Sequence, residues 1–169
     1  MISDSVSEAL NNQLNKEIYS SYLYLSMSAY LSHKGLKGGA NWFYVQAQEE
    51  MMHAQKLYGY LLSQGQMVVL QAVNAPPSDF GSALDVFELA LKHEQLVTAS
   101  INDLVATAVK ENDRASEIFL HWFVTEQVEE EENAKDVIDR LKLGGEVGPS
   151  LFMIDSELAM RVFTPPAQP

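Results

Sequence analysis

The sequence predicts an all-α fold with four long helices and a short fifth one. Apolar residues recur at the three- and four-residue spacing of an amphipathic helix along four long segments. No alternating strand pattern competes with them, and clustered glycines separate the segments. A length of 169 residues suits one hydrophobic core. We therefore expect a single domain over residues 1–169.

The first two helices are separated by a short, glycine-rich stretch. The first helix is expected from about Asp4 to His33. Three glycines between residues 35 and 39 then punctuate the chain, so the second helix is expected from about Ala40 to Gln64, ended by Gly65. Because the turn is short, the two helices should form an antiparallel pair.

The third and fourth helices form a second antiparallel pair. Ser82 is a plausible N-cap of the third helix, with Asp85 three residues later. The fourth helix is expected from Asn112 or Asp113 to just before Gly144, which places the bundle over residues 4–143. The expected apolar stripe of the third helix is Leu84, Phe87, Leu91, Glu94, Thr98, Ile101, Val105 and Ala108.

A short fifth helix is expected over residues 148–161. Pro149 suits the first turn of a helix, and the ten residues from Leu151 to Met160 are largely apolar. A helix this short does not belong inside a bundle of long ones, so we expect it to pack against something else, such as a neighbouring subunit. Residues 162–169 are expected to form a flexible tail.

The connection between residues 64 and 82 sets the topology. Fully extended, it spans roughly 50 Å, whereas each long helix covers about 40 Å. The connection can therefore run the full length of the bundle and start the third helix parallel to the second. Its apolar residues at positions 68–70 and 73 indicate that it packs along the bundle or in a subunit contact.

The chain carries a net charge of -12 and no cysteine. The acidic balance argues against nucleic acid, which needs a basic footprint, and against an anionic membrane surface, but it favours cations as partners. Without cysteine, a metal site must use oxygen and imidazole ligands. The N-terminus has no signal-peptide pattern and no segment is long and apolar enough to span a membrane, so we expect a cytoplasmic protein.

Each long helix carries a glutamate on its otherwise apolar stripe. A histidine lies one turn after one glutamate and a glutamine one turn before another, and this spacing puts both members of each pair on one face. All six residues lie near the middle of their helices, so the bundle should bring them to one level. They are Glu17, Glu50, His53, Glu94, Gln127 and Glu130.

Four carboxylates cannot share a core as bare anions, because desolvation alone costs several kcal/mol per charge. No lysine or arginine lies on these stripes to neutralise them. A pair of divalent cations would do so, and a glutamate from each helix with a Glu-x-x-His motif is typical of di-iron bundles. One buried glutamate could be a snorkelling side chain, but four at one depth predict a di-metal site.

A second group of acids lies beside this predicted centre. Glu49 precedes Glu50, and the fourth helix carries an acidic run over residues 126–132. Such runs usually form a solvated face, and that interpretation remains open. Beside a metal site, Glu49, Glu126 and Glu129 could instead hold a further ion or line the path by which iron leaves.

Several other residues invite a functional interpretation. Tyr24 lies two turns after Glu17 on the same face, and it is either a redox-active neighbour of the site or a core tyrosine. His93 and His121 lie off the stripes and are expected at the surface or in an interface. Residues expected to serve packing are Met51, Met52 and Trp122.

With these residues the chain resembles the ferritins, specifically the non-haem bacterial type, over almost its whole length. The residues that carry the resemblance are Asn15-Lys16-Glu17 with Tyr24, the run from Ala47 to Ala54, His93-Glu94, and the run from Trp122 to Glu130. The resemblance implies an up-down-down-up bundle, a hollow homo-oligomer of twenty-four copies, and a fifth helix that gathers at four-fold axes.

The resemblance also implies how metal ions are bound. The first iron would be held by Glu17, Glu50 and His53. The second would be held by Glu50, Glu94 and Glu130, with Glu50 bridging and Gln127 as an outer polar partner. A third iron site would consist of Glu49, Glu126, Glu129 and Glu130. Candidates for an ion-entry channel are Asp113 and Glu117.

Haem is not expected as a cofactor. The haem-containing bacterioferritins carry a second Glu-x-x-His motif on the last long helix, whereas here the stretch is Gln127-x-x-Glu130. Met51 stands where those relatives bind haem, so haem binding remains a minor alternative. The small twelve-subunit relatives lack the fifth helix, so the chain does not fit them either.

The function implied is iron storage with ferroxidase activity, in which dioxygen or peroxide oxidises bound Fe²⁺ and ferric mineral collects inside the shell. The alternative on the same bundle is a di-iron oxygenase or peroxidase, which would need an apolar channel to the metals and a redox partner. A metal-free helical interaction protein would not explain six polar residues that converge in the core.

Overall fold

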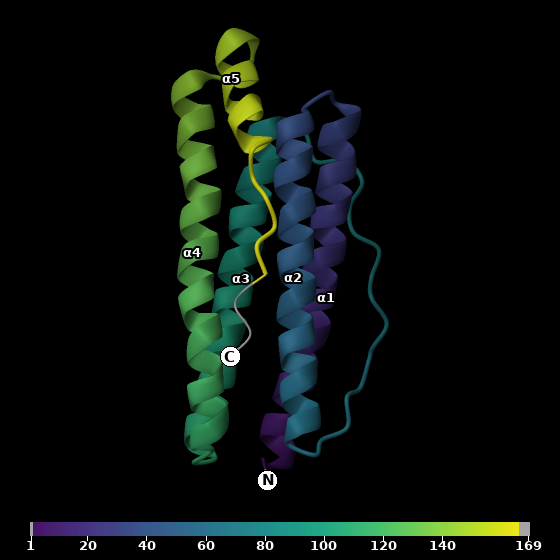
Figure 1. Ribbon diagram of the computed structural model, residues 1–169, viewed down its shortest axis with the longest axis vertical. Coiled ribbons are helices and arrows are strands. Elements are labelled where there is room, and N and C mark those ends of the chain that lie inside the picture. Colours follow the sequence, from purple (N-terminus) through teal and green to yellow (C-terminus); the bar gives the residue numbers. More distant parts are fainter. Residues whose placement is uncertain (1, 166–169) are drawn as a thin grey trace.

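The computed structural model describes residues 2–165, which form four long helices and a short fifth one without any strand (Figure 1). Helices α1 and α4 run in one direction along the bundle, and α2 and α3 run in the other. The all-α, up-down-down-up fold is therefore confirmed. The helices are α1 (Asp4–His33), α2 (Lys37–Ser63), α3 (Ala83–Lys110), α4 (Arg114–Gly144) and α5 (Gly148–Leu158).

Within the described residues, no helix is both long enough and apolar enough to cross a membrane. The tail expected over residues 162–169 is described only as far as residue 165, and its last four residues lie outside the described part.

Short polar side chains begin three of the long helices. Ser3 accepts a hydrogen bond from the Val6 amide at 3.3 Å at the start of α1. The capping box expected before α3 is present: the Asp85 amide donates to Ser82 Oγ, and the Ser82 amide donates to the Asp85 carboxylate. Asp113 caps α4, because its side chain accepts a hydrogen bond from the Ser116 amide. These bonds satisfy amides that a helix leaves unpaired at its start.

Helix α2 begins three residues earlier than the sequence indicated, because Gly38 and Gly39 belong to its first turn. These glycines allow α5 to approach closely: a Cβ at Gly38 would lie 1.5 Å from the backbone oxygen of Asp155. The amide of Gly39 also donates to the Asp155 carboxylate at 2.8 Å. The glycines therefore mark a helix contact, and interpreting them as a break between helices was wrong.

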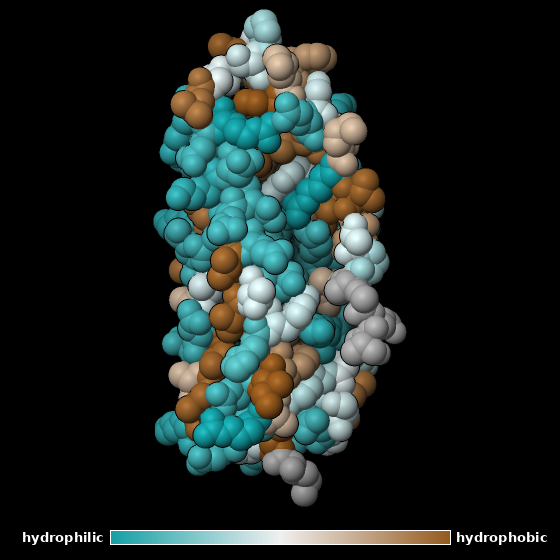
Figure 2. Space-filling model, turned by 60° about the vertical axis from the view of Figure 1, so that its left-hand side comes forward, coloured by the Kyte–Doolittle hydropathy of each residue, from teal (hydrophilic) through white to brown (hydrophobic). Residues whose placement is uncertain are grey.

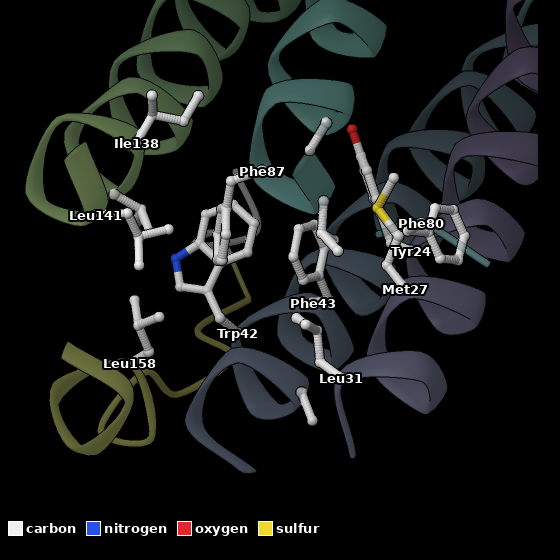
Figure 3. Packing of buried hydrophobic residues seen from close by; sticks show 14 of the residues in the cluster. Tyr24, Met27, Leu31, Trp42, Phe43, Phe80, Phe87, Ile138, Leu141 and Leu158 are labelled. Atoms are coloured by element: carbon white, nitrogen blue, oxygen red, sulfur yellow. The ribbon is translucent and has the colours of Figure 1, made fainter. Parts of the chain in front are cut away.

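Helix α5 packs on its own chain, against the start of α2 and the end of α4. Ile154 and Leu158 are buried in the same apolar cluster as Trp42 and Leu141, and Figure 3 shows Leu158 beside Leu141. The expectation that α5 would pack against something other than its own bundle is thus wrong for one of its faces. The other face, with Phe152 and Met153, is exposed.

The connection between α2 and α3 runs along the length of the bundle (Figure 1). Two asparagines of α1 hold its backbone over residues 67–71. Asn11 accepts from an amide at 2.7 Å and donates to a carbonyl at 3.1 Å, and Asn15 does the same one step further along. Val68 packs against the core, whereas Val69, Leu70 and Val73 face outward.

The core consists of two apolar clusters at opposite ends of the bundle. One, shown in Figure 3, is built around Trp42, Phe43 and Phe87, whose ring centroids lie 4.8–5.1 Å apart. The other is built around residues such as Leu10 and Phe123. On α1 the stretch between the two clusters contains Glu17, Ser20 and Ser21, all buried. The middle of the bundle is therefore polar.

The buried face of α3 is rotated slightly from the expected stripe. Phe87, Glu94, Ile101 and Ala108 are buried as expected. The other buried residues are Val86, Ala90, Val97 and Leu104, while Leu84, Leu91, Thr98 and Val105 are only partly buried. Thr98 and Leu91 instead line a surface groove between α3 and α4.

Replacing Gly38 by alanine should detach α5 from the bundle. The new Cβ would overlap the Asp155 carbonyl, and overpacking of this kind costs about 1–3 kcal/mol. Hydrogen exchange of the α5 amides should become faster in Gly38→Ala. Gly59→Ala is the matched control, because a Cβ at Gly59 in the same helix meets no atom within 4 Å. Unchanged α5 protection in Gly38→Ala would contradict this account of the contact.

Candidate metal centre

Four glutamates from four helices meet in the polar middle of the bundle. Glu17 comes from α1, Glu50 from α2, Glu94 from α3 and Glu130 from α4, and each is 5% exposed or less. His53 and Gln127 are buried beside them. The sequence thus predicted both the depth and the level of these six side chains.

Glu17, Glu50 and His53 form a compact group of metal-ligand type. Each offers one ligand atom, and the three atoms lie within 4.8 Å of one another. His53 Nδ1 lies 3.4 Å from a carboxylate oxygen of Glu50. Within the described part of the chain, Glu17 Oε2 and His53 Nε2 are buried without any hydrogen-bond partner. Buried polar atoms left unpaired are costly, and a bound cation would satisfy such atoms.

Glu94 is held from two sides at the same level. The buried Tyr24 hydroxyl donates to one of its carboxylate oxygens, and Gln127 Nε2 donates to the other at 3.1 Å. Tyr24 therefore contacts the carboxylate cluster directly, and it is also part of the apolar cluster around Phe43. Glu94 does not join the compact group of Glu17, Glu50 and His53 within 4.8 Å.

Two glutamines complete the polar layer, and the sequence analysis missed both. Gln13 donates to Glu17 at 2.8 Å. Gln46 donates to Glu130 at 2.5 Å and lies 3.5 Å from Glu50. Each glutamine stands four residues before a predicted ligand, and this spacing places it on the same helix face. A search for amides one turn before each core glutamate would have found them.

A pocket of about 220 Å³ opens beside the core glutamates. Of the predicted outer acids, Glu49 and Glu126 are half-buried in it and Glu129 lines its exposed rim. Glu126 and Glu130 each place a carboxylate oxygen within 4.8 Å of a His53 nitrogen. Figure 2, which brings the α4 side forward, shows that hydrophilic residues dominate the upper part of this face.

Two histidines of α3 and α4 behave differently. His121 is exposed, as expected. His93 is partly exposed, as expected for a residue near the surface, and lines a groove between α1 and α3, but it also lies 2.8 Å from Ser20 Oγ and packs edge-on against Tyr24. Burial lowers the pKa of His93 to about 4, so the ring is neutral near neutral pH. The small side chain of Ser20 leaves the space that this histidine occupies, which the stripe pattern of α3 did not reveal.

The residues predicted to serve packing lie near the metal centre, whereas the predicted channel residues lie at one end of the bundle. Trp122 packs against the His53 ring, with centroids 5.4 Å apart, as expected for a packing residue. Met52 lines the outer pocket, and Met51 is exposed instead of packed. Asp113 caps α4, and Glu117 pairs with Arg114 at 2.6 Å, so both predicted channel residues lie at the start of α4.

The electrostatics of the centre favour bound protons or cations. Burial raises the pKa of Glu17 and of Glu50 well above the usual range of a glutamate, and repulsion from neighbouring carboxylates is the second cause. Burial also raises the pKa of Glu94, and that of Glu130 to about 8. Among residues 2–165, no lysine or arginine forms an ion pair with these four carboxylates. Oxygen and imidazole donors in this arrangement suit iron, manganese or zinc.

Comparison with known proteins identifies the family. Residues 7–144 match the ferritin-like domain, and this range includes α2, α3, α4 and all but the first three residues of α1. The chain belongs to the ferritin family. It is 40% identical over 161 residues to a bacterial non-heme ferritin of Bacteroides fragilis, covering 95% of this chain and all of that one. It is 42% identical over 158 residues to a probable bacterial non-heme ferritin-like protein of Haemophilus influenzae, covering 94% and 96% of the two chains.

Solved structures agree with this assignment. The ferritin chain described here superposes on an open-pore ferritin from the archaeon Archaeoglobus fulgidus with a TM-score of 0.94 at 48% identity, covering 96% of this chain and all of that one. An engineered closed form of the Archaeoglobus fulgidus ferritin gives a TM-score of 0.95 at 49% identity, covering 97% of this chain and all of the other.

Metal-free protein of this ferritin should lose thermal stability as the pH rises. The pKa of Glu130 is raised from its ordinary 4.5 to about 8 in the fold. The contribution of protonated Glu130 to the free energy of unfolding is therefore complete below pH 4.5 and is lost as the pH rises through about 8. The Tm of the metal-free protein should fall by several degrees between about pH 5 and about pH 8.

The control for this pH dependence is Glu130→Gln, which cannot ionise and should flatten the decline. Saturating Zn²⁺ should restore the Tm near pH 8 more than near pH 5, because ions bind only the deprotonated carboxylates. A Tm of the metal-free protein that stays level or rises over this range would show that the core carboxyls are not protonated as described.

Proposed function

We propose that this chain is an iron-storage ferritin that oxidises Fe²⁺ at an intra-subunit centre of buried carboxylates. The observation that carries the proposal is the compact group of Glu17, Glu50 and His53, in which two buried polar atoms have no partner among the described residues. Family membership and the non-heme ferritin relatives support the same function.

In this proposal, iron is the substrate and the side chains are its ligands. Glu17 and His53 bind the first ion, Glu50 bridges, and Glu94 with Glu130 holds the second. Each ion supplies one electron, and the pair together reduces dioxygen to peroxide or peroxide to water. The protein contributes by holding two cations at one level of the buried core and by taking up or releasing protons at the carboxyls.

Tyr24 and the amides fix the carboxylates that the ions would meet. Tyr24 and Gln127 donate to Glu94, Gln46 donates to Glu130, and Gln13 donates to Glu17. Such outer hydrogen bonds orient ligands before metal arrives, and their loss typically costs about 10–100-fold in affinity or activity. We assign Tyr24 a further part as a redox-active neighbour of the pair.

The outer pocket offers a third position and a way out. Glu49, Glu126 and Glu129 join Glu130 around it, and Glu130 also faces the dinuclear centre. An ion leaving the centre can therefore pass from Glu130 to Glu126 and Glu129 without crossing an apolar barrier. The acidity of this path favours ferric iron over anionic products.

We further propose that residues 1–169 form one domain and that twenty-four copies assemble into a cytoplasmic shell. Helices of the bundle expose large apolar side chains that a lone subunit would leave in water, such as Tyr44, Leu62 and Ile118. Exposed apolar surface of this kind marks protein–protein contacts. The outer face of α5, with Phe152 and Met153, would be covered at the four-fold axes. We expect Asp113 and Glu117 to line an ion-entry channel.

The rival proposal of a di-iron oxygenase finds less support. It would need an apolar channel to the metals, but the pocket that reaches His53 and Glu130 is lined by carboxylates. Haem is not part of the proposal either. The two bacterial relatives named above are described as non-heme.

Replacing Glu17 by alanine should slow the rapid oxidation of Fe²⁺ by more than about a hundredfold, because it removes a ligand and not merely a ligand's partner. The measurement is ferric absorbance after aerobic addition of Fe²⁺ to metal-free protein, followed by sizing of the product. The parent should yield a large iron-loaded particle. Glu8→Ala, an exposed glutamate of the same helix, is the matched control.

Both variants should assemble like the parent, since Glu17 takes no part in the outer surface. Parental oxidation kinetics in Glu17→Ala would refute the assignment of the centre. Metal binding without iron accumulation, on a small oligomer, would favour the oxygenase instead.

Replacing Glu129 by glutamine should leave the first phase of oxidation within about twofold of the parent, because the dinuclear ligands are untouched, and should abolish binding of the third, weaker ion while the two tight ions still bind. The control is Glu132→Gln, a neighbouring acid that lines the groove on the opposite side of α4. The measurement is the number of Zn²⁺ ions bound per chain, determined by calorimetry. An unchanged stoichiometry would remove Glu129 from the third site.

A further inference from the structure

After α5 the chain turns back and runs along α2 (Figure 1). Arg161 is the residue that fastens this returning segment. Its backbone carbonyl accepts from Asn41 Nδ2 at 2.9 Å, and its guanidinium lies 4.4 Å from the ring centroid of Trp42. Both partners belong to the first turns of α2. Arg161 is therefore held at two points, through its backbone carbonyl and through its guanidinium.

The guanidinium reaches the edge of the proposed iron path. Its Nη2 pairs with the Glu49 carboxylate at 2.5 Å, and its Nη1 donates to Gln46 Oε1 at 2.8 Å. The Arg161 and Glu49 side chains are only 19% and 20% exposed, so solvent screens the pair incompletely. A positive charge already occupies one wall of the outer pocket.

The same pocket contains a buried polar atom without a partner, on a side chain that the pocket shares with the dinuclear centre. His53 lines it, is buried, and leaves Nε2 without a hydrogen-bond partner among the described residues. A carboxylate oxygen of Glu126 lies within 4.8 Å of a His53 nitrogen. The pocket therefore combines the unpaired Nε2 of His53 with several carboxylates. One of these carboxylates, that of Glu49, is already paired with Arg161.

Arg161 also acts on the dinuclear centre through Gln46. Arginine can only donate, so the Gln46 atom that faces it is the amide oxygen. The amide nitrogen must then point the other way, where it donates to Glu130 at 2.5 Å. Glu130 belongs to both the dinuclear centre and the third site. Arg161 thus fixes the orientation of a carboxylate that both sites share.

We propose that Arg161 is the built-in counter-cation of the outer acidic pocket, which an incoming third metal ion must displace from Glu49. While Arg161 is bound, Glu49 is neutralised and Gln46 holds Glu130 toward the dinuclear centre. When a third ion binds Glu49, repulsion drives the guanidinium away, and Gln46 loses the partner that orients it. The displaced segment after α5 then uncovers the pocket. This inference rests on the proposed function.

The first test compares Zn²⁺ binding to metal-free assembled protein, by calorimetry and by anomalous diffraction. Zn²⁺ is redox-inert, so occupancy is read without oxidation. In Arg161→Gln, the ion at Glu49 and Glu126 should bind at least about tenfold more tightly than in the parent, because a competing charge is gone. Arg140→Gln, which removes an arginine paired with Glu157 on the surface, is the control and should match the parent.

Equal affinity for the third ion in Arg161→Gln and the parent would overturn the inference while leaving the dinuclear centre intact. Absence of the two tight ions from all three proteins would instead refute the proposed function, and the inference with it. The two failures are therefore distinguishable from one titration.

A second test uses the unmodified protein. Hydrogen exchange of residues 159–163 should accelerate when the third Zn²⁺ binds and not when the dinuclear centre fills, because only the third ion competes for Glu49. Bound third metal with unchanged exchange in this segment would show that Arg161 stays in place, and would overturn the inference even if Arg161→Gln failed to fold.

Discussion

The structure depends on one electrostatic constraint, which is the presence of four carboxylates in the middle of an otherwise apolar bundle. Burying them costs free energy that no lysine or arginine of the described chain offsets. The fold accommodates them by dividing its core into two apolar clusters and by supplying amides and one tyrosine between the clusters. The apolar ends hold the helices together, so that the polar middle can remain poised for cations.

Much of this arrangement could be predicted because it is periodic along single helices. Glu50 and His53 share a face by spacing alone, and the middle of each helix is known once its ends are. The short connections then make α1 and α2, and likewise α3 and α4, antiparallel. The long connection allows α3 to run parallel to α2. The capping box at Ser82 and the path of the connection after Gln64 followed from the same local rules.

The parts that could not be predicted arise where distant segments meet. Gly38 looked like a helix break, because only the close approach of Asp155 shows why a side chain is excluded there. His93 is partly covered because the small side chain of Ser20 on another helix leaves room for its ring. Arg161 lies far from Glu49 in sequence, and a charged residue near a chain end normally indicates nothing beyond solvent exposure. Tertiary proximity, not composition, makes these residues part of the site.

The central claim is that metal ions replace protons on the buried carboxyls. Calorimetric titration of the metal-free protein with Zn²⁺ near pH 7, in buffers of different ionisation enthalpy, counts the protons that binding releases. Because the pKa of Glu130 is about 8, this group is largely protonated at that pH. The account predicts about two tight ions per chain and a net release of at least about one proton. Tight binding without proton release would contradict it.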